Sequence, residues 1–101
     1  MEAININHDN FHSEVLGSEK KVLLDFWAPW CGPCRMVSPV IDEIARERPD
    51  IKVAKINVEE APDLATLYRV YSIPTLMVME KGKVVSQSVG AKPKAAIFGM
   101  L

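Results

Sequence analysis

This chain is organised around Trp27-Ala28-Pro29-Trp30-Cys31-Gly32-Pro33-Cys34-Arg35, a stretch that contains both of its cysteines. An apolar run over residues 22–27 precedes the cysteines, and apolar residues with helical spacing follow them. We therefore expect the two sulfurs to lie where a strand leads into the N-terminus of a helix. Because a helix N-terminus stabilises a thiolate, this position favours a chemically reactive cysteine pair.

The composition limits the classes of protein that this chain can belong to. It has 101 residues, of which 49% are hydrophobic and 25% charged, so a single domain over residues 1–101 is expected. The formal net charge is -1 and the charges are interspersed, which argues against nucleic-acid binding. The sequence shows no export signal, and no apolar run reaches the roughly 18 residues of a membrane span. We expect a monomeric cytoplasmic protein that does not bind membranes.

The hydrophobic pattern predicts the secondary structure. The predicted strands cover residues 3–7, 22–27, 51–58, 75–79 and 83–89. The first helix has Asp9 or Asn10 as its cap and ends at Gly17, and the second follows the cysteines, kinks at Pro39 and ends by Pro49. A third helix begins near Pro62, and a last one begins near Pro93. The residues expected to form the buried stripe of the third helix are Leu64, Leu67, Tyr68 and Tyr71.

The order of these elements is strand, helix, strand, helix, strand, helix, strand, strand, helix. Strands linked by helices pair in parallel, whereas the last two strands, joined through Glu80-Lys81-Gly82, suit an antiparallel hairpin. The strand over residues 22–27 is apolar on both faces apart from Asp25, which is typical of a covered central strand. The predicted fold class is therefore α/β, with three parallel strands and a hairpin in one mixed sheet flanked by helices.

The spacing of the cysteines favours thiol-disulfide exchange. Cys31 is expected at the helix cap and Cys34 one turn further on, a separation at which the two side chains can close a disulfide. The exposed Cys31 would attack a partner's disulfide, and the covered Cys34 would resolve the mixed disulfide. Pro33 limits the freedom of the loop, and Gly32 lets a substrate backbone come close.

The sequence resembles the thioredoxin family. The motif Trp30-Cys31-Gly32-Pro33-Cys34 follows Asp25-Phe26-Trp27-Ala28, and Ile73-Pro74-Thr75 comes later in the chain. The resemblance covers nearly the whole chain and includes Val53-Ala54-Lys55-Ile56-Asn57 and Val89-Gly90-Ala91. It implies a thioredoxin fold and a protein-disulfide reductase that serves electron transport and redox homeostasis. It also implies that a thioredoxin reductase supplies the electrons and that no cofactor is needed beyond the redox-active disulfide.

The resemblance further implies roles for individual residues. Asp25 would be a buried carboxyl that aids proton transfer at Cys34, with Lys55 nearby. An Asp in an apolar strand independently favours a raised pKa, as a base that works near neutrality requires. Pro74 would follow a cis peptide bond and face the cysteines. The residues implied to bind substrate around Cys31 are Trp30, Gly32, Pro33, Val58, Ile73, Pro74, Thr75, Val89, Gly90 and Ala91. Trp27 is expected to pack against the loop that holds the cysteines.

Two other functions are consistent with parts of the sequence. His8 and His12 could join Cys31 and Cys34 as four ligands of a structural zinc ion, although their order along the chain is the reverse of that in a zinc finger. We predict no metal site, because a cysteine pair in a strand-helix junction better suits redox chemistry. The chain could instead be a binding module that uses the apolar surface around Cys31 without turnover.

Overall fold

Within residues 2–101, which the computed structural model describes, the strands form one five-stranded mixed sheet in the order β1-β3-β2-β4-β5. The strands are β1 (Ile4–Ile6), β2 (Val22–Trp27), β3 (Lys52–Asn57), β4 (Thr75–Glu80) and β5 (Lys83–Val89). The helices are η1 (His12–Leu16), α1 (Gly32–Glu47), α2 (Pro62–Leu67) and α3 (Lys94–Phe98). The predicted α/β fold and the predicted order of elements are both confirmed.

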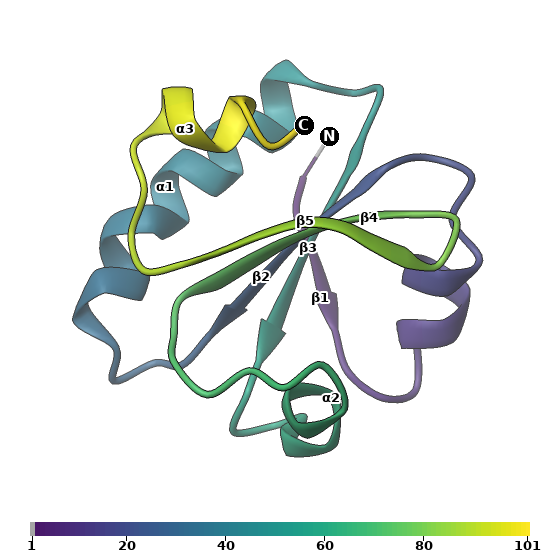
Figure 1. Ribbon diagram of the computed structural model, residues 1–101, viewed down its shortest axis with the longest axis horizontal. Helices are drawn as coiled ribbons and strands as arrows, with labels where there is room; N and C mark the ends of the chain where they lie inside the picture. The colour runs from purple at the N-terminus through teal and green to yellow at the C-terminus, as the bar shows by residue number, and fades with distance from the viewer. Residues whose placement is uncertain (1) are drawn as a thin grey trace.

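The central strand is β2, as its apolar pattern predicted. It pairs in parallel with β3 and antiparallel with β4, and β1 and β5 form the two edges of the sheet. Figure 1 shows α1 and α3 together on one side of the sheet, with α2 on the other. Val22, Leu24 and Phe26 face the side of η1 and α2, while Leu23 packs with the core of α1 and α3. Asp25 shares the side of Leu23, because alternate residues of a strand point the same way.

The third helix is shorter than its apolar pattern predicted. It ends at Leu67, and Arg69 takes a left-handed backbone conformation with a φ of 55°. The chain therefore turns away before Tyr71, which is 88% exposed, and Leu67 is 66% exposed. The expectation that these two side chains are buried is wrong. Leu64 is buried as expected, and the Tyr68 ring packs against the rings of Phe11 and Phe26.

The N-terminal helix begins differently from the prediction. Neither Asp9 nor Asn10 caps η1, whose N-cap position is Phe11 and which has no capping side chain. Asn7 instead accepts hydrogen bonds from the backbone N–H groups of Asp9 and Asn10, at 2.9 and 3.3 Å. The turn therefore precedes the helix, and Asn7 forms it because an Asn side chain readily bonds the backbone two or three residues further on.

Helix α1 holds the site in place through its buried side. Val37, Ile41 and Ile44 pack against Leu23 of β2 and Val53 of β3, and α1 runs through Pro39 to Glu47 without ending there. Such a continuous packed helix fixes the position of its own N-terminus relative to the sheet.

We expect Ile41→Val to lower the free energy of unfolding by about 1 kcal/mol, because it removes one methylene from a closely packed core. Ile41 is fully buried, so its neighbours can refill the space only in part. Denaturant unfolding would measure the change. Met36→Ala on the same helix is the control, because Met36 is 74% exposed and its change should stay within about 0.5 kcal/mol. An equal loss in both variants would contradict the expectation.

Candidate active site

Cys31 is the N-cap residue of α1, and Gly32 and Pro33 form the start of the helix. Its Sγ accepts a hydrogen bond from the backbone N–H of Cys34 at 3.2 Å. The two cysteines form a disulfide, with their Cα atoms 5.3 Å apart. One turn of helix thus brings the two sulfurs together and directs a free helix amide at Cys31.

Both cysteines are buried in the oxidised protein. Cys31 is 5% exposed and Cys34 is 2% exposed, so the expectation of an exposed Cys31 is wrong for this state. Ala28 is fully buried beside the disulfide, and Trp27, Val58 and Ile73 pack around it. The predicted packing of Trp27 against the loop of the cysteines is therefore confirmed. The exposed fractions of the two cysteines are similar, but their positions on the helix differ, because the Cys31 sulfur is at the N-cap and accepts the backbone N–H of Cys34.

The segment before β4 lies directly against the disulfide. The peptide bond between Ile73 and Pro74 is cis, as the family resemblance implied. The Ile73 carbonyl oxygen is 3.8 Å from Cys31 Sγ. The backbone N–H of Gly90, just after β5, donates to the Pro74 carbonyl oxygen at 2.8 Å. Three segments that are distant in the sequence therefore meet beside one sulfur.

The residues expected to bind substrate differ in how far they are exposed. Trp30 is 65% and Val89 53% exposed, and both are apolar. Val58, Ile73 and Gly90 are half-buried, and Ala91 is exposed. Pro74 and Thr75 are buried, so their side chains add nothing to the exposed part of this surface.

The Trp30 indole is held by an acidic side chain that the sequence analysis did not single out. Its Nε1–H donates to a Glu59 carboxylate oxygen at 2.8 Å. Glu59 follows Val58 in the loop after β3, so this contact connects the loop of the cysteines to the loop between β3 and α2. The bond limits the orientations that the exposed indole can take beside Cys31.

Asp25 is a carboxyl enclosed in the sheet and is 1% exposed. Burial raises the pKa of Asp25 from 3.8 to about 7, the positive charge of Lys55 opposes this rise, and the negative charge of Asp42 adds to it. Its Oδ1 has no hydrogen-bond partner among residues 2–101. The sequence-based expectation of a raised pKa at this position is therefore confirmed.

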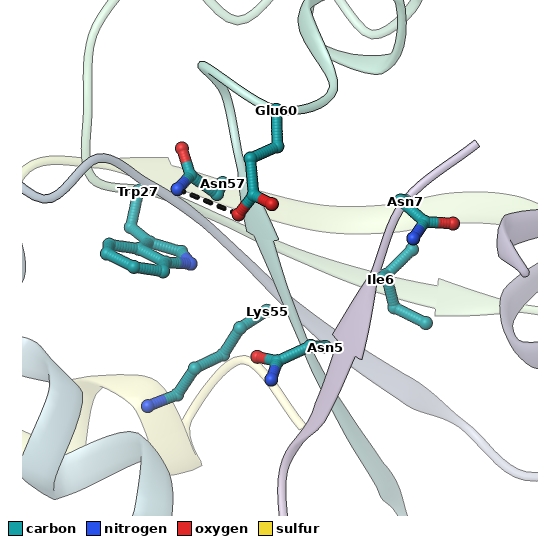
Figure 2. Close-up of a pocket in the computed structure, with 7 residues that line it drawn as sticks. All are labelled: Asn5, Ile6, Asn7, Trp27, Lys55, Asn57 and Glu60. Atoms are coloured by element: carbon teal, nitrogen blue, oxygen red, sulfur yellow. Dashed lines mark hydrogen bonds between the residues drawn. The ribbon is translucent and has the colours of Figure 1, made fainter. Parts of the chain in front are cut away.

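Lys55 lies next to Asp25 in the sheet and beside a pocket. The two residues are partners in the parallel register of β2 and β3, so their side chains share one face. Figure 2 shows the Lys55 ammonium directed toward α1, away from Glu60 and Asn57 on the opposite wall of the pocket. The pocket has a volume of about 340 Å³, and its other lining residues are Asn5, Ile6, Asn7 and Trp27. None of the lining residues is a cysteine.

The four residues considered as zinc ligands do not come together. The structure joins Cys31 to Cys34, while His8 contacts Asp9 at 3.2 Å and His12 begins η1. Within the described part of the chain, no three His, Cys, Asp or Glu side chains form a group that could hold a metal ion. That part also contains no helix with the length and apolar character needed to cross a membrane.

Comparison with known proteins identifies the family. The thioredoxin family model matches residues 2–101. The chain belongs to the thioredoxin family. It is 51% identical over 96 residues to Thioredoxin 1 of Nostoc sp., covering 94% of this chain and 90% of that protein. It is 50% identical over 94 residues to the thioredoxin of Streptomyces clavuligerus, covering 93% and 88%. It is 52% identical over 97 residues to the chloroplastic M-type thioredoxin of Chlamydomonas reinhardtii, covering 95% and 69%.

Family membership and the disulfide together establish the activity. The chain is a thiol-disulfide oxidoreductase of the thioredoxin family, and Cys31 and Cys34 form its redox-active disulfide. The family implies disulfide-containing proteins as substrates and a thioredoxin reductase as reductant. Its members include a chloroplastic protein, so the family alone leaves the compartment of this chain open.

Sequence reasoning missed three polar residues around this thioredoxin site, namely Ser38, Asp42 and Glu59. Helical spacing places Asp42 on the side of α1 opposite the apolar residues Ile41 and Ile44, but its carboxylate contacts Lys55 at 2.8 Å. A signal was available, because Ser38 and Asp42 are four residues apart and therefore lie on one side of a helix. The sequence does not show that Lys55 is their partner, because Lys55 comes from β3, which packs against the helix.

Proposed function

We propose that this chain reduces disulfides in protein partners, with Cys31 as the attacking thiol and Cys34 as the resolving thiol. One observation carries the division of roles, namely that Cys31 Sγ accepts the backbone N–H of Cys34 at the start of α1. A hydrogen bond and a helix N-terminus both favour the thiolate over the thiol. Cys34 lies inside the helix, and among residues 2–101 no backbone amide donates to its sulfur.

The reaction transfers two electrons from the dithiol to the partner. The Cys31 thiolate attacks one partner sulfur, the partner's S–S bond breaks, and its other sulfur leaves as a thiolate and takes up a proton. Cys34 loses its proton and attacks Cys31 Sγ, which releases the second partner thiol and forms the Cys31–Cys34 disulfide. A thioredoxin reductase then restores the dithiol. We also propose that the chain serves electron transport as a monomer in the cytoplasm.

Asp25 is proposed as the group that accepts the Cys34 proton, directly or through water. A base works best when its pKa is near the pH of the reaction, and the pKa of Asp25 is raised to about 7 by burial. Lys55, its neighbour on β3, is a supporting residue whose charge favours the ionised carboxyl.

Partners are proposed to dock on the apolar surface beside Cys31. This surface comprises Trp30, Gly32, Pro33, Val58, Ile73, Val89, Gly90 and Ala91. The backbone next to the buried Pro74 and Thr75 supplies polar groups for an extended partner segment. The bond between Trp30 and Glu59 supports the proposal, because an indole with a limited orientation loses less entropy when a partner covers it.

Alkylation of the reduced protein tests the division of roles. At pH 7 with a limiting amount of iodoacetamide, we expect Cys31 to be labelled before Cys34, because the thiolate is the reactive form. Peptide mass spectrometry locates the label, and a denatured sample provides the control in which both cysteines should react alike. Faster labelling of Cys34 in the folded protein would reverse the assignment.

A further inference from the structure

Lys55 lies between the buried Asp25 carboxyl and helix α1. Its side chain is 14% exposed, and its register partner on β2 is Asp25. An ammonium beside a buried carboxyl would ordinarily form an ion pair with it, since each charge stabilises the other in a poorly solvated site. Among the described residues, however, Asp25 Oδ1 has no hydrogen-bond partner.

The ammonium is bound on its other side by two residues of α1. Lys55 Nζ donates to Ser38 Oγ at 2.7 Å and lies 2.8 Å from Asp42 Oδ1. Ser38 and Asp42 are one turn apart on the same side of the helix. Figure 2 shows the consequence, since the Lys55 side chain extends from β3 toward α1.

Within residues 2–101, the charged groups that act on the pKa of Asp25 belong to this cluster. The groups that act on it are Lys55 of β3 and Asp42 of α1, while Leu76, its register partner on β4, is uncharged. Two neighbouring carboxylates of α1, those of Glu43 and Glu47, bind Lys94 of α3 instead. Because Asp42 lies 2.8 Å from the ammonium, it cancels much of the positive field that Lys55 would exert on Asp25.

We propose that Ser38 and Asp42 are positioning residues for the redox reaction. They hold the Lys55 ammonium against α1, out of direct contact with Asp25, so that this carboxyl can carry a proton near neutral pH. Without the two anchors, Lys55 would turn toward Asp25 and keep it ionised. An Asp25 held as a carboxylate is a weaker base, because an ion pair must be disturbed when it takes up the Cys34 proton. The inference rests on the proposed function of Asp25 as that base.

A titration of Asp25 tests the positioning directly. In the oxidised protein labelled with 13C aspartate, NMR follows the Asp25 carboxyl through pH. We expect Asp42→Asn to lower the pKa of Asp25 by on the order of one pH unit, because Lys55 loses its counter-charge. Lys55→Gln should shift the pKa in the opposite direction. Ser38→Ala, which leaves Asp42 in place, should lower it by less than Asp42→Asn does.

The control removes a carboxylate from the adjacent position of the same helix. Glu43→Gln should leave the pKa of Asp25 where it is, because Glu43 binds Lys94 rather than Lys55. A pKa of Asp25 that is unchanged or higher in Asp42→Asn would overturn the proposal. The titration involves no turnover, so its failure is distinct from a failure of the proposed base. That role is tested by the pH dependence of the resolving step, which should shift to lower pH in Asp42→Asn together with the pKa.

Discussion

Cys31→Ser is expected to lose disulfide reductase activity entirely, down to the rate of the uncatalysed exchange. The substitution removes the Cys31 sulfur, which accepts a helix amide and lies next to the Ile73 carbonyl. A serine hydroxyl is not ionised at neutral pH and cannot form a mixed disulfide, so no other step can replace the attack. The measurement is reduction of a protein disulfide in the presence of a thioredoxin reductase and its electron donor.

Cys34→Ser provides the matched control, because it removes one sulfur but leaves the attacking one. This variant should also fail to turn over, yet it should accumulate a stable mixed disulfide between Cys31 and the partner, visible by mass spectrometry. Accumulation in Cys31→Ser instead would reverse the two roles. If Cys31→Ser kept its biological function, the chain would act as a binding module and its turnover would be incidental.

Two features of the active site could be predicted because the local sequence determines them, namely the strand-helix junction at Cys31 and the burial of Asp25. The apolar run of β2, the cysteine spacing and the proline at the second helical residue together identify a strand-helix junction, and the structure has it at Cys31. The raised pKa of Asp25 was predictable for the same reason, because a carboxyl in a strand that is apolar on both faces must be buried.

Other features depended on contacts that local patterns do not contain. The buried stripe of α2 was extended to Tyr71 by assuming that the helix continues, but the left-handed turn at Arg69 ends it. The exposure of Cys31 was inferred from its cap position, whereas Val58 and Ile73, far along the chain, cover it. Ser38 and Asp42 contact Lys55 of β3, and Glu59 contacts Trp30, so each has a partner that is distant in the sequence.

Asp25→Asn should make the protein more stable at alkaline pH, by about 4 kcal/mol above pH 7. The native pKa of Asp25 is about 7, against an ordinary value of 3.8. Between pH 4 and pH 7, therefore, Asp25 is protonated in the folded chain and ionised in the unfolded chain. Stability of the natural chain must fall as pH rises from about 4 to about 7 and then level off. Each pKa unit corresponds to about 1.4 kcal/mol, which gives the expected difference.

Denaturant unfolding of the oxidised proteins at pH 4 and pH 8 would measure this effect. The two proteins should differ little at pH 4, where Asp25 is protonated in the folded state, and most at pH 8. Asp50→Asn is the control, because Arg48 lowers the pKa of the exposed Asp50 to about 2. Removing the Asp50 carboxylate should slightly destabilise the protein above pH 4. A natural chain whose stability does not fall between pH 4 and pH 7 would contradict the raised pKa.

A carboxyl that costs this much stability at neutral pH needs a compensating function, since asparagine would fill the same space without the charge. Proton transfer at Cys34 is such a function, because it requires a group that changes its protonation near neutrality. If Asp25→Asn gained the expected stability and also resolved the mixed disulfide at the natural rate, the stability lost by burying this carboxyl would not contribute to catalysis. Asp25 would then not be the base for Cys34.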